Sequence, residues 1–206
     1  GDHSMSDNPP AISPALTARV KSILLRPRSE WPVIRNEPST ISGLFTGYAM
    51  ILAAIGPIAS LIGGQIFGVG LLGLSVKPDI VGAIIGAVLA YVLALASIYV
   101  IGLLIDALAP SFGAEKSPIR AMKVAVYSWT AAWLAGIFGL VPMLGILGIV
   151  GLYSLYLLHL GLQDVMGAPK DKALGYTAVV IVAAIVIYFI VSTIVGLVVG
   201  GALLGA

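Results

Sequence analysis

Polar side chains gather at one place within the long apolar runs of this chain, between Tyr153 and Asp164. Tyr156, His159 and Gln163 follow one another at intervals of three and four residues, which puts them on one stripe of a helix. An imidazole can bind a ligand or transfer a proton near neutral pH, so this stripe is a candidate functional site. The alternative is a structural cluster of hydrogen bonds near the end of a helix.

Two aspartates lie at the ends of apolar runs, and both have basic residues close by in the sequence. Asp164 precedes Lys170 and Lys172, so an ion pair with either lysine is expected. Asp106 precedes three basic residues, which are Lys116, Arg120 and Lys123. A boundary ion pair is expected here too, and a gate to a cytoplasm-facing cavity is the alternative role of Asp106.

The remaining residue types exclude most catalytic chemistry. The chain has no cysteine, and His159 is its only histidine apart from His3, which excludes thiolate chemistry and metal sites with several histidines. It also lacks a Gly-x-Ser-x-Gly elbow, a phosphate-binding glycine loop and a His-Glu-x-x-His motif. We therefore expect no enzyme, no cofactor and no metal. Tyr127, which lies close to Trp129 and Trp133, is predicted to be an aromatic belt or packing residue, and its hydroxyl makes it a candidate polar or ligand residue, as Tyr153 also is.

The composition indicates what kind of element carries these residues. Of the 206 residues, 59% are hydrophobic and 10% are charged, whereas roughly a quarter of the residues in a soluble domain are charged. So few charges cannot cover a water-exposed surface, and the chain is predicted to be an all-α, polytopic integral membrane protein. Its net charge of +2 gives no indication of nucleic-acid binding.

Five membrane spans fit the apolar runs, because a helix needs about 20 residues to cross a bilayer core. Pro142 divides a run that is long enough for two helices. Glycines loosen the chain after the first span, so residues 65–74 are expected to form an apolar connection that is interfacial or re-entrant. The predicted spans are Thr40–Ile62, Ile80–Ile105, Ile119–Gly139, Met143–Leu162 and Leu174–Leu204.

Lysine and arginine are distributed unevenly among the connections. Five precede the first span, three lie between the second and third, two lie between the fourth and fifth, and the other connections hold only Lys77. Basic residues are enriched in cytoplasmic connections. This pattern predicts a cytoplasmic N-terminus and a C-terminus on the opposite side of the membrane.

Residues 14–37 are predicted to form a cytoplasmic amphipathic segment. Its helix would start at Ser13-Pro14, end before Pro27 and carry apolar residues on one face. The predicted membrane-surface residues are Arg19, Lys21, Arg26 and Arg28, with Trp31 as an interfacial anchor. Packing of this helix on the protein's own cytoplasmic face is the alternative.

The flanking segments complete the predicted organisation. Residues 1–13 are assigned to a tag remnant and a disordered N-terminus, since Gly1 to Ser4 precede Met5 and a polar, proline-rich stretch follows. No cleavable signal peptide is expected. Residues 38–206 are predicted to form the transmembrane domain.

Small residues recur at intervals of four in two predicted spans, and such faces let helix backbones approach closely. They can pack helices within one monomer or join two copies of the chain. The residues concerned are Gly82, Gly86, Ala90 and Ala94 in the second span, and Gly196 and Gly200 in the fifth.

Three stretches together resemble the Yip1 domain family in its bacterial form. The first is Pro27-x-x-x-Trp31-x-x-Ile34-x-x-Glu37, before the first span. The second is Lys-Val-Ala-Val-Tyr-Ser-Trp-Thr-Ala-Ala-Trp from Lys123, in the third span. The third is Leu-Tyr-Ser-Leu-Tyr-Leu-Leu-His-Leu-Gly-Leu from Leu152, which closes the fourth span. The resemblance covers about residues 18–200.

The resemblance implies a protein of five membrane helices with a cytoplasmic N-terminus, located in the inner membrane of a bacterium. Eukaryotic members of the family are associated with Rab GTPases and with vesicle traffic between the endoplasmic reticulum and the Golgi. Those members carry a longer cytoplasmic arm with an Asp-Leu-Tyr-Gly-Pro motif. This chain lacks the motif, so a Rab GTPase is not carried over as its partner.

Two classes of function remain. The first is a non-enzymatic protein that organises the membrane or partner proteins, its partners being membrane lipids, a second copy of the chain or a cytoplasmic protein. The alternative is a small transporter or channel, or a lipid-handling protein, with a cytoplasm-facing cavity lined by the fourth span. An intramembrane serine hydrolase is disfavoured, because His159 has no convincing serine partner.

Overall fold

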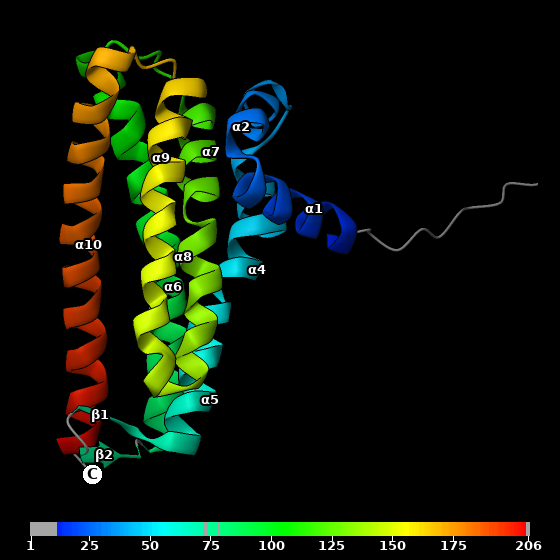
Figure 1. Ribbon diagram of the computed structural model, residues 1–206. Coiled ribbons are helices and arrows are strands. Elements are labelled where there is room, and N and C mark those ends of the chain that lie inside the picture. The colour runs from blue at the N-terminus through cyan, green and yellow to red at the C-terminus, as the bar shows by residue number, and fades with distance from the viewer. Residues whose placement is uncertain (1–11, 72–73, 78, 205–206) are drawn as a thin grey trace, which may run out of the picture.

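The computed structural model describes residues 12–71, 74–77 and 79–204. Within these ranges the regular structure is helical except for a short antiparallel hairpin of β1 (Val69–Leu71) and β2 (Leu74–Val76). The helices form an elongated bundle, and the hairpin lies at one end of it (Figure 1). The predicted helical fold is thus confirmed. The apolar connection expected at residues 65–74 instead begins with the end of a helix at Phe67 and continues into the hairpin.

Two helices, α1 (Ile12–Leu25) and α2 (Pro27–Asn36), precede the bundle. Pro27 occupies the first turn of α2, where a missing N–H costs nothing. α1 begins at Ile12, so Ser13 lies inside its first turn and not at its N-cap. Residues 1–11, which include the predicted tag remnant, lie outside the described ranges.

The first long helix runs from Ile41 to Phe67 and is interrupted in two places. Its N-terminus is capped by Thr40, whose side chain accepts a hydrogen bond of 3.0 Å from the Gly43 N–H. It passes through Gly63 and Gly64 and therefore extends past the end predicted at Ile62. Its parts are α3 (Ile41–Leu44), the π-helical η1 (Phe45–Ala49), α4 (Met50–Ala53) and α5 (Ile55–Phe67).

Proline and glycine account for the second interruption and for the end of this helix. The turn at Ala54 lies just before Pro57, whose ring cannot donate to the preceding helical turn. Gly68 has a φ of 80°, a left-handed conformation that favours glycine, and it ends α5.

The predicted second and fifth spans are the two longest helices, α6 (Ile80–Leu108) and α10 (Lys170–Leu204). The Asp79 carboxylate accepts a hydrogen bond of 3.0 Å from the Gly82 N–H and caps α6. A short 3₁₀ turn, η2 (Ala109–Phe112), follows α6.

The predicted third span is broken into α7 (Pro118–Ser128), α8 (Thr130–Ala135) and the 3₁₀ segment η3 (Gly136–Leu140). The helix breaks at Trp129, which leaves backbone groups nearby without their usual helical partners. One of these, the Ala132 N–H, donates to Ser154 Oγ at 2.9 Å. A side chain of the adjacent pass therefore satisfies the break.

The predicted fourth span starts as a 3₁₀ helix, η4 (Pro142–Leu152), and continues as α9 (Tyr153–Asp164). Side chains three residues apart eclipse one another in a 3₁₀ helix, which makes long runs crowded. Gly145, Gly148 and Gly151 follow at that interval and remove the crowding. The prediction of an α-helix from Met143 was therefore wrong for the first half of this segment.

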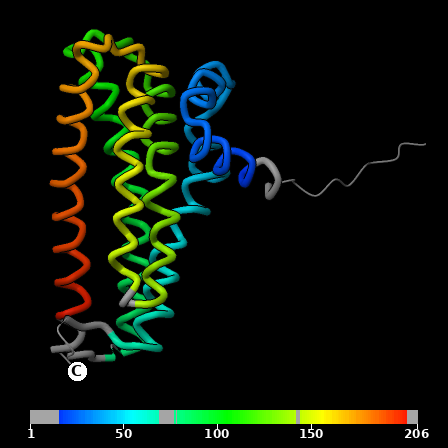
Figure 2. Tube along the Cα trace, in the orientation of Figure 1, coloured from blue at the N-terminus to red at the C-terminus, as the bar shows by residue number. Residues whose placement is uncertain are grey.

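The chain runs up and down the bundle in sequence order (Figure 2). The passes are α3 to α5, then α6, then α7 to η3, then η4 and α9, and last α10. Neighbouring passes include α6 against α10 and α7, α9 against α7 and α10, and α5 against η3. Four helices in the described residues are long and apolar enough to cross a membrane: Ile41–Phe67, Ile80–Phe112, Leu144–Asp164 and Lys170–Gly200.

Burial divides the bundle into two parts, which we call the head and the belt. The largest fully buried side chains, such as Trp31, Ile105, Met122 and Leu158, all lie in the head. Most of the exposed large apolar side chains lie in the belt. The head comprises residues 16–36, 98–128 and 154–180, and the belt comprises residues 50–67, 80–97, 131–152 and 181–204.

The helix lengths agree with this division. α10 has 35 residues, which at 1.5 Å per residue makes it about 52 Å long. A bilayer core is only about 30 Å thick. Part of the bundle therefore extends beyond the hydrocarbon, and the tightly packed head is the part suited to water.

Candidate functional site

α2 is fixed to the head by one apolar face and forms the centre of the candidate site. Pro27, Trp31 and Ile34 are spaced four and three residues apart and are all buried against the bundle. Gly161 makes room for Trp31: a Cβ at Gly161 would lie 2.9 Å from Cζ2 of Trp31 and 3.2 Å from Cγ1 of Val124. Only glycine fits there without a shift of its neighbours.

Lys123 caps the C-terminal end of α2 from the neighbouring helix α7. Its Nζ donates to the backbone oxygen of Ile34 at 2.7 Å, to that of Arg35 at 3.4 Å and to that of Glu37. These carbonyls have no partner within α2, and the helix dipole adds to their attraction for a cation. Lys123 is only 3% exposed, so its charge stabilises the attachment of α2 and is not a surface charge. We call α1 and α2 together the α1–α2 hairpin.

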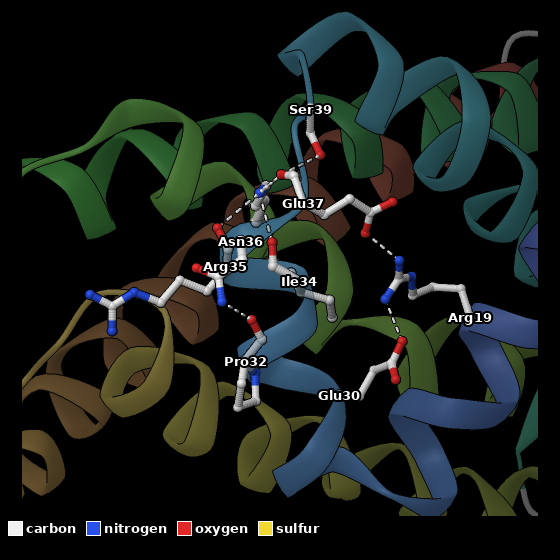
Figure 3. Close-up of polar contacts among 9 residues, drawn as sticks. Arg19, Glu30, Pro32, Ile34, Arg35, Asn36, Glu37 and Ser39 are labelled. Carbon is white, nitrogen blue, oxygen red and sulfur yellow. Dashed lines mark hydrogen bonds and ion pairs between the residues drawn. The ribbon is translucent and has the colours of Figure 1, made fainter.

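Arg19 of α1 joins the two N-terminal helices to the chain that enters the bundle. Its guanidinium forms ion pairs with Glu30 of α2 and with Glu37 after α2 (Figure 3). It also lies over the Tyr127 ring, with Cζ 5.7 Å from the ring centroid. We call this set of contacts, together with Trp31, Ile34, Lys123, Val124 and Gly161, the α2 dock.

α1 is held by further contacts with the bundle. Ile23 is fully buried, and Leu16, Val20 and Leu24 pack against the same core. The Tyr153 hydroxyl donates to the Leu24 carbonyl at 3.0 Å. The apolar face of α1 thus packs on the protein itself from Leu16 onward, as the alternative prediction had it.

The predicted membrane-surface residues fall into two groups. Arg19 and Trp31 face inward, since Arg19 is engaged in the dock and Trp31 is fully buried. Trp31, which precedes the first span, is therefore a core residue and not an interfacial anchor. Lys21, Arg26 and Arg28 are exposed. They share the outer surface of α1 and α2 with two exposed apolar residues, Leu25 and Val33.

The predicted stripe of Tyr156, His159 and Gln163 is only partly brought together. His159 Nδ1 lies 2.9 Å from Thr177 Oγ1, and His159 Nε2 lies 2.7 Å from Gln163 Nε2. Tyr156 takes no part in these bonds. It is 39% exposed and packs beside Tyr153, with their ring centroids 5.5 Å apart.

The partners of Thr177 determine which nitrogen of His159 carries the proton. The Thr177 hydroxyl donates to the Ala173 carbonyl at 2.7 Å, so its oxygen accepts from Nδ1–H of His159. Nε2 then accepts from the Gln163 amide, which has a hydrogen to donate. Both nitrogens are engaged in a neutral ring. This arrangement suits a fixed structural link between α9 and α10 better than proton transfer.

Neither predicted aspartate ion pair is present among the residues that the structure describes. The ion pairs there are Arg19–Glu30, Arg19–Glu37 and Arg120–Glu115. At Asp164 it is the backbone oxygen that is bonded, by Arg35 Nη1 at 3.0 Å, and this caps the end of α9. Asp106 is 8% exposed and its Oδ1 has no hydrogen-bond partner. Sequence proximity was a poor guide because α2 brings Arg35 to Asp164 from far away in the chain.

Tyr127 and Tyr48 form an aromatic pair behind the dock. Their ring centroids are 4.7 Å apart at a steep angle. The Tyr48 hydroxyl is hydrogen-bonded to Thr130 Oγ1 at 2.8 Å. The Thr130 hydroxyl donates to the Tyr127 carbonyl. These bonds stabilise the chain beside the break at Trp129. The packing role predicted for Tyr127 is consistent with this position.

A cavity of about 690 Å³ lies beside the dock, between α1 and the start of the first long helix. It is lined by polar groups of Arg19, Glu37, Thr40, Tyr48 and Tyr127. A second cavity of about 580 Å³ lies in the belt, and it is lined by Gly86, Ala90 and Ala94 of α6. Neither cavity has a lining residue from α9 among the described residues.

The glycines of the two small-residue faces differ in their surroundings. A Cβ at Gly86 would lie 2.6 Å from Val199 Cγ2 of α10, so Gly86 packs within the monomer. A Cβ at Gly196 or Gly200 would meet nothing within 4 Å. Gly82 lies next to the N-terminus of α6, where its N–H donates to the Asp79 cap.

The sequence did not reveal the roles of several of these residues. Lys123 was expected to pair with Asp106, and Gly161 entered only as part of a stretch that resembles the Yip1 family. Thr177, the partner of His159, was not named. The interval of Pro27, Trp31 and Ile34, which matches one helix face, was the available signal for the dock. Within the described residues, no group of three or more histidine, cysteine, aspartate or glutamate side chains could hold a metal ion. The contacts hold helices together, and the Thr177 hydroxyl beside His159 donates to the Ala173 carbonyl and not to the ring.

A family model of the Yip1 domain matches residues 21–193. The chain belongs to the Yip1 domain family. Comparison with curated proteins and with solved structures gave no match.

The Yip1 match extends from α1 into α10 and includes every residue of the α2 dock except Arg19. The three stretches that resemble the Yip1 family also meet there. Trp31 comes from the first, Lys123 and Val124 from the second and Gly161 from the third. The sequence features of this Yip1 domain thus coincide with the place where α2 is attached to the bundle.

Proposed function

We propose that this Yip1 domain protein crosses the bacterial inner membrane five times, with its head in the cytoplasm. The passes alternate between the head and the β1–β2 end, and the broken pass α7 to η3 is one of them (Figure 1). All but one of the 11 lysines and arginines lie at the head end, the exception being Lys77 beside the hairpin. That bias supports a cytoplasmic head, a cytoplasmic N-terminus and a C-terminus on the opposite side.

The chain has no cysteine, so single-cysteine variants test this orientation directly. Ser111→Cys lies in the head and Lys77→Cys lies beside the β1–β2 hairpin, and both positions are exposed. In intact cells, a membrane-impermeant maleimide is expected to label only Lys77→Cys, while opened cells label both. Labelling of Ser111→Cys in intact cells would show that the head lies outside the cytoplasm and would contradict the proposed orientation.

The proposed function is non-enzymatic: the protein holds the α1–α2 hairpin at the cytoplasmic surface, where it organises the membrane or receives a peripheral partner protein. The α2 dock carries this proposal. Its ionic and polar groups, above all Arg19 and Lys123, are used to fix the hairpin. What remains exposed is a surface with Lys21, Arg26 and Arg28, which suits an anionic headgroup layer or an acidic protein.

The direction of α1 supports an action on the membrane itself. α1 runs away from the bundle at a steep angle to α10 (Figure 1). It is attached at the level of Tyr127 and Tyr153, below the top of the head. At that level it adds width to the protein on the cytoplasmic side alone. Such asymmetry between the two leaflets favours a curved bilayer.

Vesicle shape tests this function. The protein is reconstituted into vesicles of phosphatidylethanolamine with phosphatidylglycerol, and vesicle diameters are measured by electron cryomicroscopy. We expect the wild type to give smaller vesicles than protein-free lipid. The triple variant Lys21→Glu, Arg26→Glu, Arg28→Glu should lose this effect, because its hairpin no longer attracts anionic lipid. The variant Lys170→Glu, Lys172→Glu is the control, since it changes exposed charges of the head outside the hairpin.

Two outcomes would count against the proposal. One is a vesicle size that does not depend on the protein or on the hairpin charges. The other is a solute flux across the same vesicles that His159→Ala abolishes. That second result would favour the alternative, a transporter that works through the fourth span.

A further inference from the structure

The belt cavity of about 580 Å³ extends along α6 and α10 and is partly open. α6 and α10 provide most of its lining residues, and the rest come from α5, from the break at Trp129 and from Trp133 of α8. Trp129 and Trp133 line it toward the head, and Gly86 meets Val199 toward the other end. The cavity is thus bounded along the bundle axis, and its opening is lateral.

The lining is mostly apolar, and no charged side chain is among its described residues. Its polar groups belong to two serines, two tryptophans and a tyrosine, which are Ser60, Ser97, Trp129, Trp133 and Tyr188. The Ser97 hydroxyl donates to the Leu93 carbonyl of its own helix at 2.6 Å, so it offers no donor to an occupant. Water needs two or more polar partners to remain in a protein cavity. An uncharged, apolar occupant is therefore favoured.

The dimensions suit a single extended chain. The cavity follows α10 from Ala184 to Val199, a distance of about 22 Å at 1.5 Å per residue. This course along α10 accommodates an extended chain.

The cavity is continuous with the surface that faces the bilayer. Two of its lining residues, Ser60 of α5 and Tyr188 of α10, are exposed on the outside of the bundle. These residues lie in the belt, where the surrounding solvent of a membrane protein is the acyl chains of lipids. From its continuity with the outer surface of the belt, its lack of charged residues and its length, we propose that this cavity is a binding site for one acyl chain of a bilayer phospholipid, which enters sideways.

Tryptophan quenching by brominated lipid tests this site. Trp133 lines the cavity and is 8% exposed, so a chain in the cavity is in contact with it while most surrounding lipid is not. Trp31 lies in the head and stays unchanged as a constant background. Protein is reconstituted in phosphatidylcholine with brominated or with plain acyl chains, and the ratio of the two fluorescence intensities is measured.

Two variants of α6 provide the comparison. Ala94→Phe fills the cavity, whereas Val92→Phe is a matched change on the outer face of the same helix, where Val92 is 54% exposed. We expect brominated lipid to quench the wild type and Val92→Phe alike, and Ala94→Phe to lose most of that quenching. Equal quenching of the two variants would overturn the proposal.

A measurement on the wild type keeps the proposal testable if Ala94→Phe does not fold. A phosphatidylcholine with a photoreactive group in its acyl chain is activated in the same vesicles, and the labelled residues are mapped. Labels on the cavity residues Ala90, Ala94 or Val191 are expected. Labels restricted to outward residues such as Val88 and Phe189 would overturn the proposal. A second copy of the chain that covers the cavity would also overturn the proposal. It would be detected as crosslinked dimers in which the cavity residues carry no label.

Discussion

At the scale of single residues, this protein depends on a few side chains that satisfy the ends of helices belonging to other segments. Lys123 caps α2, Arg35 caps α9 and Ser154 satisfies the break in the third pass. Each joins segments that are distant in the sequence. Unpaired backbone groups are costly when buried, so these contacts also determine which helices lie together.

Gly161 gives a sharp test at this scale. Gly161→Leu would place a side chain where Trp31 and Val124 already lie, and overpacking of this kind typically costs about 1–3 kcal/mol. We expect a lower free energy of unfolding and faster trypsin cleavage after Arg28 and Arg35, because α2 leaves the bundle. Both are measured on purified protein in vesicles.

The control for this change is Gly196→Leu, whose Cβ position has no neighbour within 4 Å. It adds the same side chain to an open helix surface and is expected to leave trypsin cleavage unchanged. Equal cleavage of the two variants would mean that α2 is not held by the fit of Trp31 against Gly161.

At the scale of elements, the helices of this protein are irregular, and the irregularities have local causes. Pro57 accounts for the turn at Ala54, and glycines at every third position permit the long 3₁₀ segment η4. The break at Trp129 is tolerated because a neighbouring side chain satisfies Ala132. A 3₁₀ helix rises about 2.0 Å per residue, so η4 covers more of the belt than an α-helix of the same length.

Alanine variants of two serines compare a hydrogen bond between two passes with one inside a single helix. Ser154→Ala leaves the Ala132 N–H without its acceptor in a partly buried place, at a cost of about 1 kcal/mol. Ser97→Ala removes only a bond to a carbonyl of its own helix and is expected to be near neutral. Unfolding free energies and hydrogen exchange at Ala132 measure the difference. Exchange at Ala132 that is unaffected by Ser154→Ala would contradict this account.

The elements also reveal where sequence reasoning succeeded. The charge-free runs and their turn residues located the helices at α6 and α10 well, because length and composition alone decide those segments. The helix interior of η4 could not be foreseen, because its apolar residues suit either helix type. The hairpin β1–β2 was missed for a similar reason: an apolar, glycine-rich connection has no clear alternation.

The candidate site was less accessible from the sequence than the fold. Trp31 looked like an interfacial anchor because it lies just before a span, yet its interval with Pro27 and Ile34 marks a buried face. In a chain this apolar, hydrophobicity does not say which face points inward. The predicted partners of Asp106 and Asp164 were chosen by proximity in sequence and were wrong. Two of the three ion pairs among the described residues instead join Arg19 of α1 to Glu30 and Glu37.

At the scale of the whole molecule, the division into head and belt implies that two solvents act on one bundle. The head buries large side chains as a water-soluble protein does, since the hydrophobic effect drives packing only where water is present. The belt exposes its large apolar side chains and packs through small ones, as lipid-exposed helices do. The same helix, α10, passes from one regime to the other.

Two positions on α10 test this division because their exposure in the protein is nearly equal. Leu174 is 71% exposed in the head and Tyr188 is 66% exposed in the belt. In vesicles, Leu174→Cys is expected to react readily with a charged, water-soluble maleimide, and Tyr188→Cys is expected to be protected by the hydrocarbon. In detergent-free denaturant both should react alike, which controls for intrinsic reactivity. Because burial within the protein is matched, a difference in vesicles measures the membrane boundary itself. Equal labelling would mean that the bilayer does not end between these two residues, and the head would then lie in the same solvent as the belt.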